Sequence, residues 1–257
     1  MSTALYDRVI FGPIHSRRLG LSLGVNLLPL NHKLCSFDCI YCECGWGEKR
    51  EKVRFNDRET VRKELERKLT EMVEAGTPPD VITFAGNGEP TLHPDFGEII
   101  EDTIALRDRI APRAKVSVLS NATQIGRERV RAALLRVDNN ILKLDSAFDP
   151  TVRLVDRPRG NYSVAETVEN MKKFEGQLIV QTMFLRGEFE GKIVDNTTEE
   201  EVSAWLALIR EIAPRQVMVY TIDRSTPAEN LQKVTVEELK AIAARVEALG
   251  ITCSVAG

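Results

Sequence analysis

The chain has 257 residues, of which 43% are hydrophobic and 28% are charged. These fractions are close to the average of folded proteins, so they exclude collagen-like, coiled-coil and intrinsically disordered chains. The 35 lysine and arginine residues stand against 38 aspartate and glutamate residues, which gives a formal net charge of −3. A chain without an overall positive field is not a scaffold that binds nucleic acid by charge neutralisation alone.

Six short apolar runs predict strands, at residues 23–28, 81–85, 116–119, 141–144, 178–184 and 217–222. Helical patterns lie between and after them, at residues 57–75, 96–110, 127–137, 164–174, 199–212 and 236–249. Each predicted strand is followed by a helix. This alternation predicts a parallel sheet with right-handed crossovers.

The fold class that we predict is α/β, as a single domain built as an incomplete parallel TIM-type barrel of six β/α units. A complete barrel of eight units needs about 250 residues for its repeats alone, and a doubly wound open sheet is the alternative. No Pro, Gly or Ser-rich segment is long enough to separate two domains. We expect an amino-terminal arm of about residues 1–20, and we expect residues 12–24 and the carboxyl-terminal tail to cover the barrel mouth.

The first ten residues contain Asp7 and Arg8, and no apolar run approaches the length of a membrane span. We therefore expect a cytoplasmic protein without a signal peptide or a membrane partner. In that compartment, five cysteines suggest metal or redox chemistry sooner than disulfides. Cys253 lies in an apolar segment, where a small buried side chain is the simplest interpretation.

The longest predicted connection, about residues 29–54, contains the other four cysteines. Three of them, Cys35, Cys39 and Cys42, have the spacing CxxxCxxC. A four-iron cluster usually has four cysteine ligands, so three thiolates leave one iron open to another ligand. The alternative is a closed zinc site in which Cys44 or His32 is the fourth ligand.

The segment Cys35-Ser-Phe-Asp-Cys39-Ile-Tyr-Cys42, with Tyr41 just before its third cysteine, resembles the cluster motif of the radical S-adenosylmethionine (radical SAM) superfamily. Residues 86–90, Gly-Asn-Gly-Glu-Pro, follow the second predicted strand, where the superfamily has a Gly-Gly-Glu-like segment that receives the methionine amino group. Asn87 replaces the commoner glycine. Residues 12–25 and 217–227 resemble the group that includes wyosine-base synthases, although no cysteine precedes Cys35 here.

The resemblance implies that Cys35, Cys39 and Cys42 hold a 4Fe-4S cluster whose fourth iron binds S-adenosylmethionine. It implies reductive cleavage to a 5′-deoxyadenosyl radical that abstracts a hydrogen atom from a substrate, and an electron donor such as flavodoxin or ferredoxin. A base in transfer RNA is one candidate substrate, and a protein, as in glycyl-radical activation, is another. A non-enzymatic binding module stabilised by zinc is the third hypothesis.

Ligands of parallel α/β folds bind at the carboxyl ends of strands, so polar residues at those ends are candidates for the binding site. Gly86 and Gly88 allow a ligand to approach the backbone closely, and Glu89 offers a carboxylate to an ammonium group. The candidate cofactor-binding residues are Tyr41, Gly86, Asn87, Gly88, Glu89, Ser120, Asn121, Lys143 and Asp145.

Several of these candidates have a second interpretation. Ordinary turn capping explains Ser120 and Asn121 nearly as well as ligand binding does. Lys143 and Asp145 face the same side of a predicted strand, where they either pair with each other or contact a ligand. By resemblance, Tyr41 is expected to pack near the adenine, and stacking of an aromatic ring on a base is physically reasonable.

Three arginines, Arg153, Arg157 and Arg159, follow the fourth predicted strand. Such a cluster close to the entrance of a barrel is able to bind a phosphate group. A solvated run of arginines is the alternative interpretation.

Overall fold

The computed structural model describes residues 5–16, 19–47 and 53–257. The expected arm at residues 1–20 and the expected loop at residues 29–54 therefore extend in part outside the described residues. One curved sheet contains β1 Ile10–Ser16, β2 Gly20–Val25, β3 Val81–Phe84, β4 Lys115–Ser120, β5 Asn139–Lys143, β6 Ile179–Met183, β9 Gln216–Tyr220 and β11 Thr252–Ala256. Its strand order is β1-β2-β3-β4-β5-β6-β9-β11. β1 is antiparallel to β2, and every other neighbouring pair is parallel.

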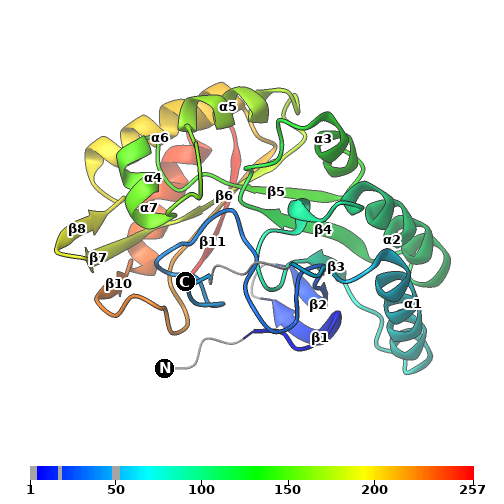
Figure 1. The fold of residues 1–257 in the computed structure, drawn as a ribbon. Coiled ribbons are helices and arrows are strands. Elements are labelled where there is room, and N and C mark those ends of the chain that lie inside the picture. Colours follow the sequence, from blue (N-terminus) through cyan, green and yellow to red (C-terminus); the bar gives the residue numbers. More distant parts are fainter. Residues whose placement is uncertain (1–4, 17–18, 48–52) are drawn as a thin grey trace.

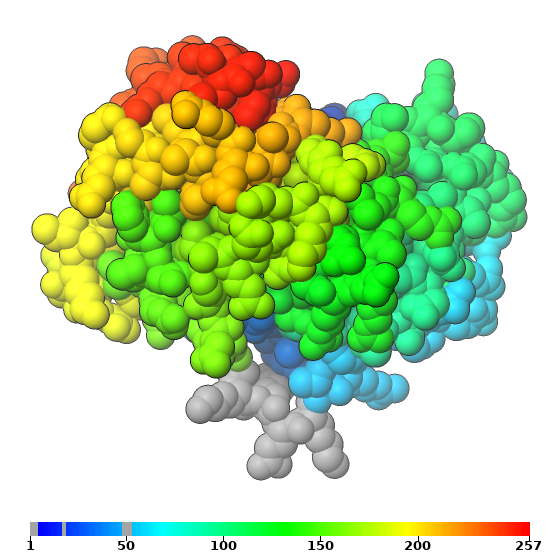
Figure 2. Space-filling model, turned by 90° about the horizontal axis from the view of Figure 1, so that it is seen from above, coloured from blue at the N-terminus to red at the C-terminus, as the bar shows by residue number. Residues whose placement is uncertain are grey.

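Helices lie in every crossover between parallel strands. They are α1 Arg58–Glu74, α2 Phe96–Ile110, α3 Glu128–Leu134, α4 Asp149–Val155, α5 Val164–Lys172, α6 Glu199–Ile212 and α7 Val236–Glu247, with a short 3-10 turn, η1 Pro90–Leu92. The helices surround the outer side of the curved sheet (Figure 1). On the helical face, the successive units lie side by side in chain order (Figure 2). The fold is a single α/β domain with an open, partial parallel barrel.

Side-chain caps fix the starts of α1, α5, α6 and α7. Asp57 accepts a hydrogen bond from Thr60 N (3.0 Å) at the start of α1. Thr235 and Glu238 form a reciprocal capping box at the start of α7, which satisfies two backbone N–H groups that would otherwise lack a partner. Such caps stabilise a helix by about 1 kcal/mol each.

Alternate residues of the strands divide between two apolar regions. Leu142 and Val180 belong to the large core between the sheet and the helices, whereas their neighbours Ile141 and Ile179 form a small cluster with Met218. This alternation follows from the two-residue period of a strand. The concave side of the sheet is therefore separate from the main core and free to hold a site.

The six predicted β/α units are present, but the predicted strict alternation is wrong. A second sheet of three antiparallel strands, β7 Leu185–Phe189, β8 Lys192–Asp195 and β10 Leu231–Lys233, is inserted after β6 and β9, in the order β10-β7-β8. We refer to it as the small sheet. It lies beside one end of the main sheet (Figure 1).

The expected covers of the mouth are also wrong. Residues 10–16 of the arm form β1, and the carboxyl-terminal tail forms β11, so both belong to the sheet itself. Cys253 is half-buried on β11. α4 was not predicted, and α3 is shorter than the expected helix at residues 127–137. Among the described residues, no helix is long and apolar enough to cross a membrane.

Candidate active site

The connection between β2 and α1 holds four cysteines, and we call its residues 29–47 the cysteine loop. One flank of this loop is fixed to residues 86–90, which follow β3 and which we call the glycine turn. Leu34 N donates to Asn87 O (2.8 Å), and Glu89 N donates to Leu34 O (3.1 Å). A Cβ on Gly88 would lie 1.8 Å from Leu34 O, so this close backbone approach requires glycine.

The other flank of the cysteine loop is fixed to residues 155–159, just after α4. Asp38 N donates to Asp156 O and Ile40 N to Val155 O, both at 2.9 Å. Arg159 N donates to Ser36 O at 2.8 Å. The loop is therefore held between two segments, one that follows β3 and one at the end of α4, after β5.

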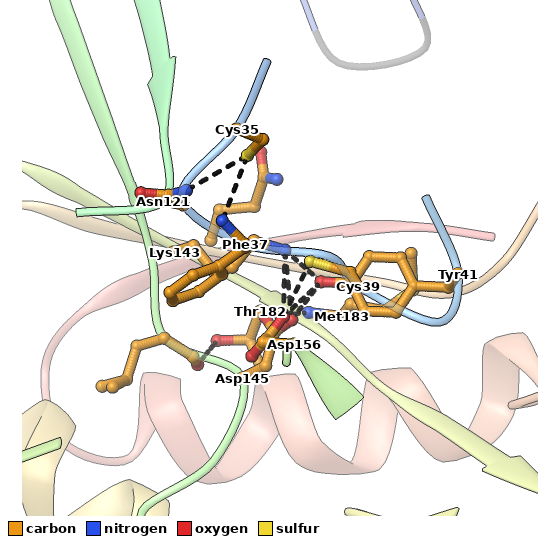
Figure 3. Close-up of polar contacts among 12 residues, drawn as sticks. Cys35, Phe37, Cys39, Tyr41, Asn121, Lys143, Asp145, Asp156, Thr182 and Met183 are labelled. Atoms are coloured by element: carbon orange, nitrogen blue, oxygen red, sulfur yellow. Dashed lines mark hydrogen bonds and ion pairs between the residues drawn. The ribbon is translucent and has the colours of Figure 1, made fainter. Parts of the chain in front are cut away.

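The thiols of the loop have different neighbours. Cys35 Sγ accepts hydrogen bonds from Asn121 Nδ2 and Phe37 N, both at 3.4 Å, while Cys39 Sγ donates to Asp156 Oδ1 at 3.2 Å (Figure 3). Burial and then the Glu89 carboxylate raise the pKa of Cys35 to about 12. Hydrogen bonding with Cys44 and the nearby Lys33 ammonium lower the pKa of Cys42 to about 5, against the effect of burial.

Lys33 is a member of the site that the sequence did not reveal. Its side chain is 2% exposed, and its ammonium donates to Gly45 O (2.8 Å) and to Asp38 Oδ1 (3.1 Å). Burial acts to lower the pKa of Lys33, but the three thiols of Cys42, Cys35 and Cys39 and then Asp38 raise it overall. One buried cation thus lies inside the loop that carries the three cysteines of the CxxxCxxC motif.

The glycine turn has two glycines with positive φ, Gly86 (130°) and Gly88 (139°). The side chain of Asn87 accepts from Tyr6 N and donates to Tyr6 O and Pro29 O, each at 2.8 Å. Asn87 therefore ties the amino-terminal segment to the turn through its side chain, while its backbone N–H donates to Asn26 Oδ1 (3.2 Å) and its carbonyl accepts from Leu34 N.

The carboxylate of Glu89, which we expect to receive an ammonium group, is held in place by protein donors. Its Oε1 accepts from Thr91 N (3.0 Å), Thr91 Oγ1 (2.5 Å) and Ser120 Oγ (2.9 Å), while Oε2 accepts from Asn121 N (2.7 Å). Burial raises the pKa of Glu89, and these hydrogen bonds act in the opposite direction. Oε2, with one protein donor, keeps capacity for one more.

Lys143 and Asp145 pair with each other, which is one of the two interpretations that the sequence allows. Lys143 Nζ lies 3.2 Å from Asp145 Oδ2. The hydroxyl of Tyr41 contacts both groups, and the Lys143 ammonium lies 4.5 Å from the centre of the Tyr41 ring. Asp156, which the sequence analysis missed, accepts from Tyr41 Oη at 3.2 Å. Burial and then Asp145 raise the pKa of Asp156 to about 7. Tyr41 and Cys39 are thus joined to the ends of β5 and α4 (Figure 3).

Two of the three predicted arginines are already paired. Arg159 lies 3.6 Å from Asp38 Oδ2, and Arg157 lies 3.8 Å from Glu190 and stacks over the adjacent rings of Trp46 (4.9 Å) and Phe189 (5.1 Å). Arg153 donates to Tyr162 O at 3.1 Å. A hollow of about 590 Å³ lies beside this stack, between the cysteine loop and the small sheet.

The donor chemistry of the loop fits an iron–sulfur cluster. Three thiols come from one eight-residue segment of the loop that encloses Lys33, and soft thiolates are the protein ligands that such clusters prefer. In the described part of the chain, no group of three or more His, Cys, Asp or Glu side chains is placed to hold a single metal ion.

Comparison with known proteins places this geometry in a family. The profile of the radical SAM superfamily matches residues 32–197. The chain is 29% identical over 240 residues to the protein named GTPase Obg of Brachyspira hyodysenteriae, covering 92% of this chain and 33% of that protein. It is 31% identical over 242 residues to a UPF0026 protein of Methanocaldococcus jannaschii, covering 92% of this chain and 70% of that protein.

Solved structures share the fold. A radical SAM methyltransferase from Sphaerobacter thermophilus superposes with a TM-score of 0.67 at 14% identity, covering 91% of this chain and 65% of that one. The structure of TYW1 with a lysine-pyruvate adduct bound superposes with a TM-score of 0.64 at 14% identity, covering 88% and 73%. Radical SAM enzymes in general use S-adenosylmethionine and a 4Fe-4S cluster. The profile match and the sequence relatives show that this chain belongs to the radical SAM superfamily of enzymes and to the UPF0026 family.

Proposed function

We propose that the protein reductively cleaves S-adenosylmethionine and uses the resulting 5′-deoxyadenosyl radical to abstract a hydrogen atom from a substrate. In this proposal Cys35, Cys39 and Cys42 hold the 4Fe-4S cluster. The observation that carries it is the double attachment of the cysteine loop, through Leu34 to the glycine turn and through Asp38 and Ile40 to residues 155–156. The loop and the turn thus form one rigid unit at the carboxyl edge of the sheet.

The bound cluster would supply one electron for cleavage of the sulfonium, giving methionine and the radical. The chain itself positions the cosubstrate. We assign the methionine ammonium to the backbone of Gly86, Asn87 and Gly88 and to Glu89 Oε2, which has acceptor capacity left. Asn121, which links Glu89 to Cys35, and Ser120 keep that carboxylate in place.

We assign the adenine to the ring of Tyr41. Its hydroxyl is held by Lys143 and Asp145, so the ring has a fixed orientation before the cosubstrate binds. Preorganisation of this kind avoids the cost of ordering a side chain on binding. A reactive primary radical must also be kept from water, and the concave side of the sheet is the enclosed place for it.

The substrate and the electron donor are further parts of the proposal. The donor is a low-potential carrier such as flavodoxin or ferredoxin, and the candidate substrates are a base in transfer RNA and a protein. The likeness to TYW1 concerns the fold alone. The first step, cleavage of S-adenosylmethionine, is independent of the substrate and is the one to test.

The test is anaerobic reconstitution with iron and sulfide, followed by dithionite and S-adenosylmethionine, with 5′-deoxyadenosine quantified. The comparison protein is the triple variant Cys35→Ala/Cys39→Ala/Cys42→Ala. Cys253→Ala is the matched control, because that thiol lies on β11 outside the loop. We expect the nucleoside from the wild type and from Cys253→Ala but not from the triple variant. A colourless, inactive protein with about one zinc per chain would refute the proposal and favour a zinc-stabilised loop.

A further inference from the structure

Lys33 lies two residues before Cys35, and the cysteine loop folds back over it. Its ammonium donates to Gly45 O, beyond the fourth cysteine, and to Asp38, between the first and second cysteines. These two contacts close the loop around the ammonium, whose side chain is 2% exposed. Burying the ammonium group of a lysine in an apolar or thiol-rich loop costs free energy. A lysine that is buried at this cost indicates that its positive charge has a function.

Other cations near the loop have their charge offset elsewhere. Lys143 is held by Asp145 (3.2 Å) and Asp156 (3.7 Å), and Arg159 is 39% exposed, where water screens its charge. The carboxylate partner of Lys33 is Asp38 (3.1 Å), and that carboxylate also accepts from Gly47 N (2.8 Å) and pairs with Arg159. Because Asp38 is shared among these donors, it offsets the charge of the Lys33 ammonium only in part.

We propose that Lys33 is a positioning residue whose buried ammonium raises the reduction potential of the cluster held by Cys35, Cys39 and Cys42. This inference rests on the proposed function. In reduction, the cluster takes one electron from an external low-potential donor, and its net charge becomes one unit more negative. A fixed positive charge at short range and low dielectric stabilises the reduced state more than the oxidised state. Lys33 itself gains and loses no proton in this step.

The neighbouring charge predicts an effect of the opposite sign. Asp38 is a carboxylate on the same loop, so its negative charge opposes reduction. Replacing Asp38 by asparagine removes that charge but keeps an oxygen that is able to accept from Lys33 and Gly47. A purely structural role for this pair would weaken the loop in both variants, and it would not move the potential in opposite directions.

The experiment is a potentiometric titration of the reconstituted cluster without S-adenosylmethionine, followed by electron paramagnetic resonance. The proteins are the wild type, Lys33→Met, Lys33→Arg and Asp38→Asn, each with its iron and sulfide content measured. We expect a more negative midpoint for Lys33→Met, by about tenfold in the reduction equilibrium, or 59 mV for one electron. Lys33→Arg should stay near the wild type, and Asp38→Asn should become more positive.

The outcomes separate this inference from the proposed function. A wild type that takes up no cluster contradicts the function itself. A fully loaded Lys33→Met with an unchanged midpoint overturns the role of Lys33. Should Lys33→Met fail to hold the cluster, Asp38→Asn decides, because a midpoint that is unchanged or more negative in that variant also overturns the proposal.

Discussion

Four cysteines lie within ten residues of the chain, but their thiols contact different groups and therefore have different roles. Cys39 donates to the buried Asp156, whereas Cys44 lies 3.3 Å from Gly86 O, on the flank of the loop that faces the glycine turn. We therefore treat Cys44 as a link between the loop and the turn, and Cys35, Cys39 and Cys42 as the ligand set. The distinction is testable one residue at a time.

We predict that Cys39→Ala abolishes formation of 5′-deoxyadenosine and lowers the iron content after reconstitution. Cys44→Ala should retain both, because it removes one weak hydrogen bond worth about 1 kcal/mol or less. Iron and sulfide analysis together with nucleoside quantification measures both properties. Loss of cluster in the two variants alike would place Cys44 among the ligands.

At the scale of single residues, the sequence predicts those whose spacing is itself a signal. Cys35, Cys39 and Cys42 belong to a motif, and so do Gly86 and Glu89. Lys33 and Asp156 have no such signal. The contacts of Lys33 with Asp38 and Gly45 depend on how the loop folds, and Asp156 is 117 positions from Cys39, to which it is bonded. In the run of residues 153–159 the sequence indicates only positive charge, although Asp156 within it is a buried carboxylate.

Between elements, the critical contact is the backbone bridge from Leu34 to Gly88, which sets the cysteine loop against the turn after β3. We predict that Gly88→Ala disrupts this contact. Its φ of 139° disfavours any side chain, and the new Cβ would meet the Leu34 carbonyl. Iron uptake and nucleoside formation should both fall, while circular dichroism keeps the signal of the folded domain.

Gly76→Ala is the matched control for that variant. Gly76 has a φ of 72°, but a Cβ there has no atom within 4 Å. It should cost about 1 kcal/mol of stability through strain alone and leave cluster assembly unchanged. Equal loss of iron in both variants would show that general destabilisation, rather than the bridge, is responsible.

A second prediction between elements concerns Asp138, which joins α2 to β4. Its Oδ2 accepts from Arg107 Nη1 and from Val116 N, both at 2.8 Å. Burial acts to raise the pKa of Asp138, but the Val116 hydrogen bond and Arg107 outweigh it, so the pKa is lowered. A lowered folded-state pKa adds stability above the unfolded pKa of about 3.9, and this stability is lost as the pH falls through the folded value.

We therefore expect Asp138→Asn to lower the free energy of unfolding by about 1–3 kcal/mol at pH 7. The difference from the wild type should shrink below about pH 4, where Asp138 in the unfolded chain takes up a proton before it does so in the folded protein. Urea unfolding followed by circular dichroism at pH 7, 5 and 3.5 measures it. A difference that stays constant over this range would mean that the charge of Asp138 contributes nothing to stability.

The elements themselves were predictable where their pattern is long and regular. α2 Phe96–Ile110 and α6 Glu199–Ile212 have the expected bounds, since each carries a continuous apolar stripe. β1, β7 and β10 were not predicted, because their own sequences lack the pattern of a strand. β1 contains Gly12 and Pro13, β7 contains Gly187, and β10 has three residues, so none shows the alternation that marks a strand.

At the scale of the whole molecule, the net charge limits which classes of substrate the protein is able to attract. The net charge of −3 offers RNA no general attraction, so binding has to come from a local surface. Arg153, Arg157 and Lys192 line one hollow of about 460 Å³ between α4 and the small sheet, and Glu190 offsets only Arg157 among them. We name this hollow the basic hollow. It is the place where a phosphate backbone would be held.

If transfer RNA is the substrate, its binding should weaken steeply with salt, and Arg153→Ala/Lys192→Ala should reduce the slope of log K against log salt by about 1 to 2. Arg129→Ala/Lys240→Ala, on α3 and α7, removes the same charge from residues that do not line the basic hollow and should leave the slope unchanged. Filter binding of unmodified transfer RNA between 50 and 200 mM salt, roughly the range over which such contacts are lost, measures both. Binding that is absent or insensitive to salt removes the RNA hypothesis, because contacts with phosphate groups release counterions and therefore depend on salt. A protein substrate then remains, and a glycyl radical signal in a candidate partner is the observation that would identify it.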